Sequence, residues 1–151
     1  MNNSRRALLC STAAAAATAF FGVSGRVLAS MEDVDKMIAE FGGGAVVEEA
    51  GPLQLTTPEI AENGNSVPVS FVVDSPMTDD EYVVSVMIMA SDNPSPDVAT
   101  FHFTPASGLA KASTRMRLAR TQDVVAVAKT NSGQLFKVSN NVKVTIGGCG
   151  G

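Results

Sequence analysis

The chain has 151 residues, of which 45% are hydrophobic and 17% charged, and its formal net charge is −4. This length and composition suit one globular domain with a buried core and exclude a disordered chain. The absence of Trp, with one Tyr and one His, argues against a base-stacking surface and a multi-histidine metal site. The negative charge argues against nonspecific binding to nucleic acid.

The first 29 residues have the features of an export signal. They contain three arginines and no acidic residue, and Arg5 and Arg6 directly precede an Ala-rich apolar stretch that runs to Val23. Small or short side chains before Ser30 offer a cleavage site after Ala29. This pattern resembles a twin-arginine signal peptide and predicts a periplasmic protein that is not membrane-bound after cleavage. An N-terminal anchor helix is disfavoured, because the stretch is short and interrupted by Gly.

Cleavage at this point changes the cysteine content and the charge of the chain. The 122 residues that remain carry a charge of −7, and Cys149 is their single cysteine because Cys10 leaves with the signal. The charge is also uneven along the chain: residues 30–110 hold fourteen acids and one base, whereas 111–151 hold seven bases and one acid. A lone thiol in a compartment that permits disulfides has no partner in its own chain.

An amphipathic helix is predicted over residues 31–41. Apolar side chains recur there with the i, i+3, i+4, i+7 spacing of one helix face, at Val34, Met37, Ile38 and Phe41. Acidic residues occupy the first turn, where the helix dipole favours them, and the glycines at 42–44 end the helix. We expect this helix to pack on the protein surface; a docking helix for a partner is the less favoured interpretation.

The rest of the body has the pattern of an all-β fold. Short apolar or alternating runs are separated by turn residues from Leu53 onward. The predicted strands cover residues 67–73, 82–90, 98–103, 113–118, 124–129, 135–138 and 142–146, with 139–141 as the turn of a final hairpin. Their number and spacing favour an immunoglobulin-like antiparallel β-sandwich. We therefore treat residues 30–146 as one β-sandwich domain.

Some residues within these elements have both a structural and a functional interpretation. Pro68 within a strand indicates an edge position or a bulge. His102 points away from two aromatic neighbours, so we expect it to face solvent or to pack rather than to bind metal. Met87 and Met89 share one strand face and are interpreted as core residues rather than a soft-metal pair. Asn63 and the glycine after it are expected to form a turn.

Three arginines form the basic cluster of the sequence. Arg115, Arg117 and Arg120 lie within six residues, and the first two share one face of a predicted strand. A solvated strand face is the simplest interpretation. The alternative is a surface that meets acidic groups of a partner or steers anionic substrates.

The chemistry of the sequence is concentrated in its last five residues, Gly147, Gly148, Cys149, Gly150 and Gly151. Glycine on both sides of the cysteine predicts a thin, flexible arm that enters sites closed to ordinary side chains. Nothing adjacent in sequence lowers the pKa of the thiol or supplies a base, so the arm lacks the groups that an enzyme needs for nucleophilic catalysis. We therefore predict a carrier whose thiol is activated in the sites that it enters, without a cofactor or metal of its own.

At this point the chain resembles the SoxY family, the carrier subunits of the bacterial thiosulfate-oxidising Sox system. The resemblance is carried by the ending at residues 142–151 and extends over nearly the whole mature chain. The further matching segments are residues 60–64, 67–69, 74–77, 93–94, 100–105 and 114–119.

The resemblance implies a heterodimer with a second β-sandwich protein, SoxZ, and a substrate held covalently on Cys149. SoxXA would join thiosulfate to the thiol oxidatively, and SoxB would release the terminal group as sulfate. SoxCD, where present, would oxidise the remaining sulfane sulfur. The family does not imply catalytic residues within the carrier itself.

Two other functional classes use parts of the same tail. A ubiquitin-like carrier would be activated at the carboxylate of Gly151, but this requires ATP and suits the cytoplasm, which the export signal opposes. A redox or metal-delivery module would use Cys149, but no second ligand lies near it in the sequence.

Overall fold

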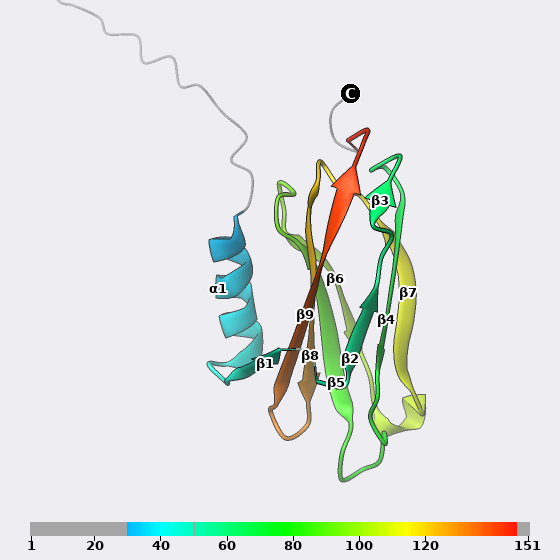
Figure 1. Cartoon of the computed structure of the whole chain (residues 1–151). Coiled ribbons are helices and arrows are strands. Elements are labelled where there is room, and N and C mark those ends of the chain that lie inside the picture. The colour runs from blue at the N-terminus through cyan, green and yellow to red at the C-terminus, as the bar shows by residue number, and fades with distance from the viewer. Residues whose placement is uncertain (1–29, 50, 148–151) are drawn as a thin grey trace, which may run out of the picture.

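The computed structural model describes residues 30–49 and 51–147 and consists of a helix packed on a two-sheet sandwich (Figure 1). The larger sheet has the strand order β1-β9-β8-β5-β6, with β3 also paired to β9, and the smaller sheet has the order β2-β4-β7. Neither helix in the described residues is long and apolar enough to cross a lipid bilayer. The predicted signal peptide, residues 1–29, lies outside the described residues.

The elements of the described residues follow one another closely along the chain. They are α1 (Met31–Gly42), β1 (Val47–Glu49), β2 (Leu53–Thr56), β3 (Ile60–Ala61), β4 (Val67–Val73), β5 (Val83–Ala90), β6 (Asp97–His102), a short 3₁₀ helix η1 (Pro105–Ser107), β7 (Ala110–Met116), β8 (Gln122–Thr130) and β9 (Leu135–Val144). The prediction of an all-β sandwich with a short helix before it is therefore confirmed.

The predicted final hairpin is wrong, because β9 runs through the expected turn as one strand. It pairs antiparallel with β8 from Leu135 to Val142, and Asn141 lies opposite Asp123. The Asn141 amide donates to Asp123 Oδ1 at 2.8 Å, and the Asn140 amide donates to the carbonyl oxygen of Leu55 at 3.0 Å. Asparagines that favour turns in isolation are thus held in the strand by side-chain partners.

The central strands of the larger sheet are covered on both faces. Val86, Ile88 and Ala90 of β5 join the core between the two sheets. Met87 and Met89 point to the other face, where they pack in a second cluster under α1. A strand buried on both sides has no polar face, which explains its nearly continuous apolar sequence. The prediction that the two methionines are core residues is confirmed.

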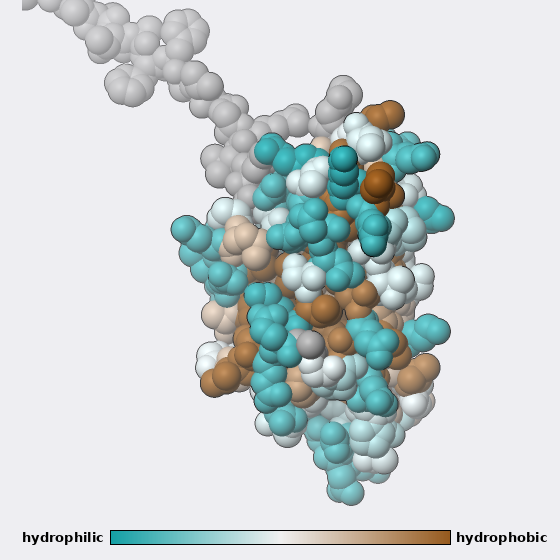
Figure 2. Space-filling model, viewed as in Figure 1, coloured by the Kyte–Doolittle hydropathy of each residue, from teal (hydrophilic) through white to brown (hydrophobic). Residues whose placement is uncertain are grey.

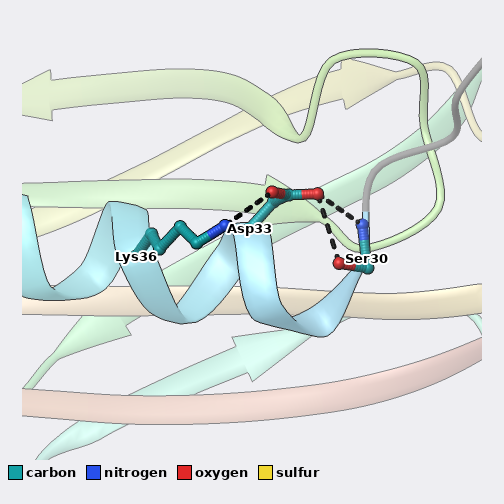
Figure 3. A network of polar contacts seen from close by, with 3 residues as sticks. All are labelled: Ser30, Asp33 and Lys36. Atoms are coloured by element: carbon teal, nitrogen blue, oxygen red, sulfur yellow. Dashed lines mark hydrogen bonds and ion pairs between the residues drawn. The ribbon is translucent and has the colours of Figure 1, made fainter.

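Helix α1 begins with a capping box. The Asp33 carboxylate accepts from the Ser30 backbone amide at 3.0 Å and from the Ser30 hydroxyl at 3.2 Å, and Lys36 lies 3.5 Å from it (Figure 3). The hydrogen bond from the Ser30 backbone is the main reason why the pKa of Asp33 falls below its usual value. The cap satisfies a backbone donor that the helix itself leaves unpaired.

The apolar face of α1 is occupied by the larger sheet. Val34 and Ile38 are buried in one cluster with Leu135 of β9 and with side chains of β8 and β5. At the other end of the helix, Lys129 Nζ donates to the carbonyl oxygen of Phe41 at 3.0 Å, and Gly43 terminates the helix with a φ of 63°. Surface packing, the favoured interpretation of this helix, is confirmed.

Pro68 lies in a central strand, at a place where that strand has a neighbour on one side. It pairs with Arg115 of β7, while β2 pairs with β4 only from Ser70 to Val73. Proline therefore has no ladder donor to lose on the open side. The predicted edge character applies to this part of β4, although the strand as a whole is central.

Candidate functional site

The candidate site is the end of the sandwich at which the C-terminal segment leaves β9. Cys149, Gly148, Gly150 and Gly151 lie outside the described residues, and Gly147 is the last residue described. Figure 1 shows β9 ending beside β3 at this end of the molecule. The structure therefore defines the base from which the predicted arm extends.

Hydrogen bonds hold the base of the segment on the loop after β3. The Thr145 amide donates to the carbonyl oxygen of Ala61 at 3.1 Å, and its hydroxyl donates to the carbonyl oxygen of Glu62 at 2.9 Å. One residue later, the carbonyl oxygen of Ile146 accepts from the Gly64 amide at 2.8 Å. The chain is thus fixed for two residues beyond the last strand.

Gly64 connects this base to the segment that follows β7. Its carbonyl oxygen accepts from the Leu118 amide at 2.8 Å, so one glycine bridges Ile146 and Leu118. The predicted turn is present here, and the Asn63 side chain closes it by accepting from the Asn65 amide at 2.9 Å. A short polar turn therefore joins three segments that are far apart in the sequence.

Gly147 has a steric role in addition to the flexibility predicted for it. A Cβ atom built on Gly147 would collide with the backbone carbonyl oxygen of Ala119. Leu118, which precedes Ala119, is fully buried and anchors this segment in the core. Glycine is needed at position 147 because the two backbones approach too closely for any side chain.

Two buried amides hold the segment against which Gly147 packs. Asn93, which is 8% exposed, donates to the carbonyl oxygen of Arg117 at 2.8 Å and accepts from the Ala119 amide at 3.0 Å. Gln122, which is 3% exposed, donates to Asn93 Oδ1 at 3.0 Å and to the carbonyl oxygen of Arg120 at 3.2 Å. This pair was not predicted from the sequence; two amide residues flanking apolar strands were the available signal.

The three arginines of the basic cluster are exposed at this end of the molecule. Arg115 donates to Ser66 Oγ at 3.2 Å. Within residues 30–49 and 51–147, the ion pairs join Lys36 to Asp33 and Lys137 to Glu49, so the arginine cluster contributes to none. The guanidinium groups of Arg117 and Arg120, which donate no hydrogen bond within the described residues, are therefore available to a ligand or partner, whereas that of Arg115 is bound to Ser66.

Apolar side chains are also exposed beside the base. Ile60 at the start of β3 is 56% exposed, and Ile146 is 66% exposed. Figure 2 shows brown side chains on the surface at this end of the sandwich. Ile60 pairs with Lys143 of β9, and Ile146 lies two residues beyond the end of β9. The end that presents the tail thus combines exposed apolar and basic groups.

His102, which the sequence analysis also considered as a metal ligand, lies away from the tail. His102 is exposed on β6, between Phe101 and Phe103, both of which pack near Phe71 with ring centroids 5.3 and 6.1 Å from it. The predicted solvent-facing orientation is confirmed. Among the described residues, no three His, Cys, Asp or Glu side chains are grouped closely enough to hold a metal ion.

A family model described as sulfur oxidation protein SoxY matches residues 38–149 of this chain. Among solved structures, the sulfur carrier protein SoxY from Chlorobium limicola is 35% identical, with a TM-score of 0.66 over 78% of this chain and 100% of its own. No curated protein matches the sequence.

More distant structures share the fold. A superoxide reductase (neelaredoxin) variant from Ignicoccus hospitalis has 14% identity and a TM-score of 0.56, over 63% of this chain and 81% of its own. A superoxide reductase-like protein from Thermotoga maritima has 17% identity and a TM-score of 0.54, over 66% and 92%. At these identities the likeness concerns the sandwich alone.

Proposed function

This chain belongs to the SoxY family of sulfur oxidation proteins, and we propose that it carries sulfur intermediates covalently on Cys149 during thiosulfate oxidation. The observation that carries the proposal is the extent of the family match, which reaches residue 149 and so includes the single cysteine of the predicted mature chain. The 35% identity to a sulfur carrier protein supports the same role.

In the proposed first step, the Cys149 sulfur bonds to the sulfane sulfur of thiosulfate. The thiolate and thiosulfate together lose two electrons, which the haem partner SoxXA accepts, and a cysteine S-thiosulfonate is formed. SoxB then hydrolyses it: water supplies the oxygen, sulfate and two protons leave, and a persulfide remains on the protein. SoxCD, where present, oxidises that sulfur further.

The role of the chain itself in this cycle is to present the thiol rather than to activate it. The sequence around Cys149 provides neither a base nor an oxyanion donor, so bond making depends on the enzymes that the arm enters. Cys149 is two residues beyond Gly147, which gives the thiol a reach of about 7 Å beyond the fixed base. Glycines on both sides keep this reach free of side chains.

The proposal includes the partners and the compartment. We propose that the chain forms a heterodimer with SoxZ in the periplasm, after removal of the twin-arginine signal over residues 1–29. The family membership and the sequence of the signal support this. Transfer among several enzymes requires a soluble carrier that meets each of them in turn.

The test is the intact mass of the protein purified from cells that oxidise thiosulfate. We expect a reductant-sensitive mass increase in the wild type and none in Cys149→Ser, whose fold is unchanged by circular dichroism. As a matched control, Ser95→Cys in the Cys149→Ser background puts a thiol on an exposed turn of the same end, and it should gain no sulfur. A mass increase in Cys149→Ser would contradict the proposal.

A further inference from the structure

The segment at residues 117–120 carries two arginines directly beside the point where the tail leaves the body. Gly147 packs on the carbonyl oxygen of Ala119, and Ala119 is followed by Arg120. The Leu118 amide is joined through Gly64 to Ile146, and Leu118 is preceded by Arg117. The two arginines therefore flank Ala119, which Gly147 contacts directly, and Leu118, which Gly64 links to Ile146.

This segment has a fixed backbone although both its arginines are exposed. The Asn93 side chain binds the carbonyl oxygen of Arg117, and the Gln122 side chain binds that of Arg120. Both amide side chains are more than nine-tenths buried and are themselves hydrogen-bonded to each other. A buried polar network of this kind holds one backbone geometry, because an alternative would leave buried groups unpaired.

The arginines of this segment form no ion pair with the carboxylates of the described residues. Within the described residues, neither Arg117 nor Arg120 makes an ion pair, and their guanidinium groups donate no hydrogen bond there. Glu62, an acid beside the base, accepts from Thr145 through its backbone carbonyl oxygen and is exposed. The fixed arginines thus remain free to bind an anion.

We infer that Arg117 and Arg120 form a resting cradle for the anionic end of the group carried on Cys149. The inference rests on the proposed function, because an S-thiosulfonate or S-sulfonate is an anion with three terminal oxygens. Guanidinium groups bind such oxygens through paired N–H donors. Cys149 is two residues beyond Gly147, so its adduct extends from a point within about 7 Å of the Ala119 contact. The cradle keeps a loaded tail on the body until a partner takes it.

The experiment compares anionic and neutral groups that are placed chemically on Cys149 of the ¹⁵N-labelled protein, purified with its partner subunit. Tetrathionate converts the thiolate to the S-thiosulfonate and releases thiosulfate, whereas iodoacetamide gives a neutral adduct and releases iodide. Backbone order parameters are then measured for the Gly148 and Gly150 amides. Because the adducts are made in vitro, the result does not depend on whether cells load the thiol.

With the S-thiosulfonate, we expect these order parameters to rise from the flexible range below about 0.6 toward the value of about 0.85 for rigid backbone. With the neutral adduct they should stay low. The double variant Arg117→Ala/Arg120→Ala should lose the difference, and Lys111→Ala, an exposed base at the far end of β7, should keep it. High salt should also reduce the difference, because the contact lies at the surface.

Equal order parameters for the two adducts in the wild type would overturn the inference. So would a difference that persists in the double variant. If the arginine substitutions slow loading by the haem partner but leave the tail unchanged, the arginines contact acidic groups of that partner and the cradle is wrong. The proposed function would survive each of these outcomes, since it is tested separately by the mass of the native protein.

Discussion

The two ends of the sandwich are held together in different ways. At the end where the tail leaves, buried amides of Asn93 and Gln122 fix the segment after β7. At the opposite end, the loop before β5 is tied by the exposed Asn131, whose side chain donates to the carbonyl oxygen of Asp80 and accepts from the Tyr82 amide. The buried amides show that the fold requires an exact backbone position at the end where the tail leaves.

The ends also differ in charge. The loop over residues 74–82 at the far end carries four acids and no base, whereas the segment over residues 115–120 at the tail end carries three arginines and no acid. An anionic cargo or substrate is therefore repelled by the loop over residues 74–82 and attracted by the arginines over residues 115–120. A fixed, basic exit suits a carrier that must present a charged group from one place.

Replacing the buried amide should have the largest effect on stability. Asn93→Ala leaves the Ala119 amide and the carbonyl oxygen of Arg117 without partners, and each buried unpaired group costs about 1–3 kcal/mol. We expect a loss of about 3 kcal/mol in the free energy of unfolding, measured by urea denaturation. Asn131→Ala at the opposite end should lose about 1 kcal/mol. Equal losses at the two ends would remove the contrast.

The next effect concerns the close contact of the tail base. Gly147→Ala forces the segment away from the carbonyl oxygen of Ala119, which should cost about 1–3 kcal/mol as an overpacked contact. Under the proposed function it should also slow loading of Cys149 by partner enzymes, because the exit point moves. The matched change, Gly150→Ala, lies beyond this contact and should leave the melting temperature unchanged. A melting temperature that falls equally in both variants would contradict the steric role.

A smaller effect is expected where the helix is tied to the far end of the larger sheet. Lys129→Met keeps most of the apolar stem but removes the hydrogen bond from Nζ to the carbonyl oxygen of Phe41. We expect about 1 kcal/mol of destabilisation by urea denaturation. An unchanged free energy of unfolding would show that the apolar face of α1 holds the helix without this contact.

The smallest effect should come from the exposed cap of α1. Hydrogen bonds from Ser30 lower the pKa of the Asp33 carboxyl below its ordinary value of 3.8. A lowered pKa in the folded state means that the carboxylate stabilises the fold above pH 3.8 and that this contribution disappears as the pH falls through the folded pKa. Asp33→Asn should therefore be less stable than the wild type at pH 7, and the difference should vanish below the folded pKa. A difference that stays constant with pH would exclude this carboxylate as its source.

The elements of the fold could be read from the sequence where a single pattern determined them. Helix α1 and strand β4 follow from apolar periodicity, and β5 follows from its continuous apolar run. The break predicted at residues 139–141 was wrong because the partners of Asn140 and Asn141 come from β2 and β8. Turn propensity is a local property, and here the contacts between distant segments outweigh it.

The site was predictable in its chemistry but not in its support. Cys149 and its glycines stand out in the sequence, whereas the contact between Gly147 and Ala119 depends on how two loops meet. The buried pair of Asn93 and Gln122 was missed for the same reason, since the two residues are 29 positions apart in the sequence. Sequence periodicity indicates which residues are buried, but it does not indicate which polar groups meet there.

The measurement that bears most directly on the central claim is the mass of the last tryptic peptide from protein isolated during thiosulfate oxidation. Lys143 is the final basic residue, so trypsin releases residues 144–151 with the thiol included. We predict that this peptide accounts for the whole sulfur-dependent mass increase of the protein and that a reductant removes it. A peptide that always carries an unmodified thiol, or an increase that maps to residues 30–143, would contradict the account.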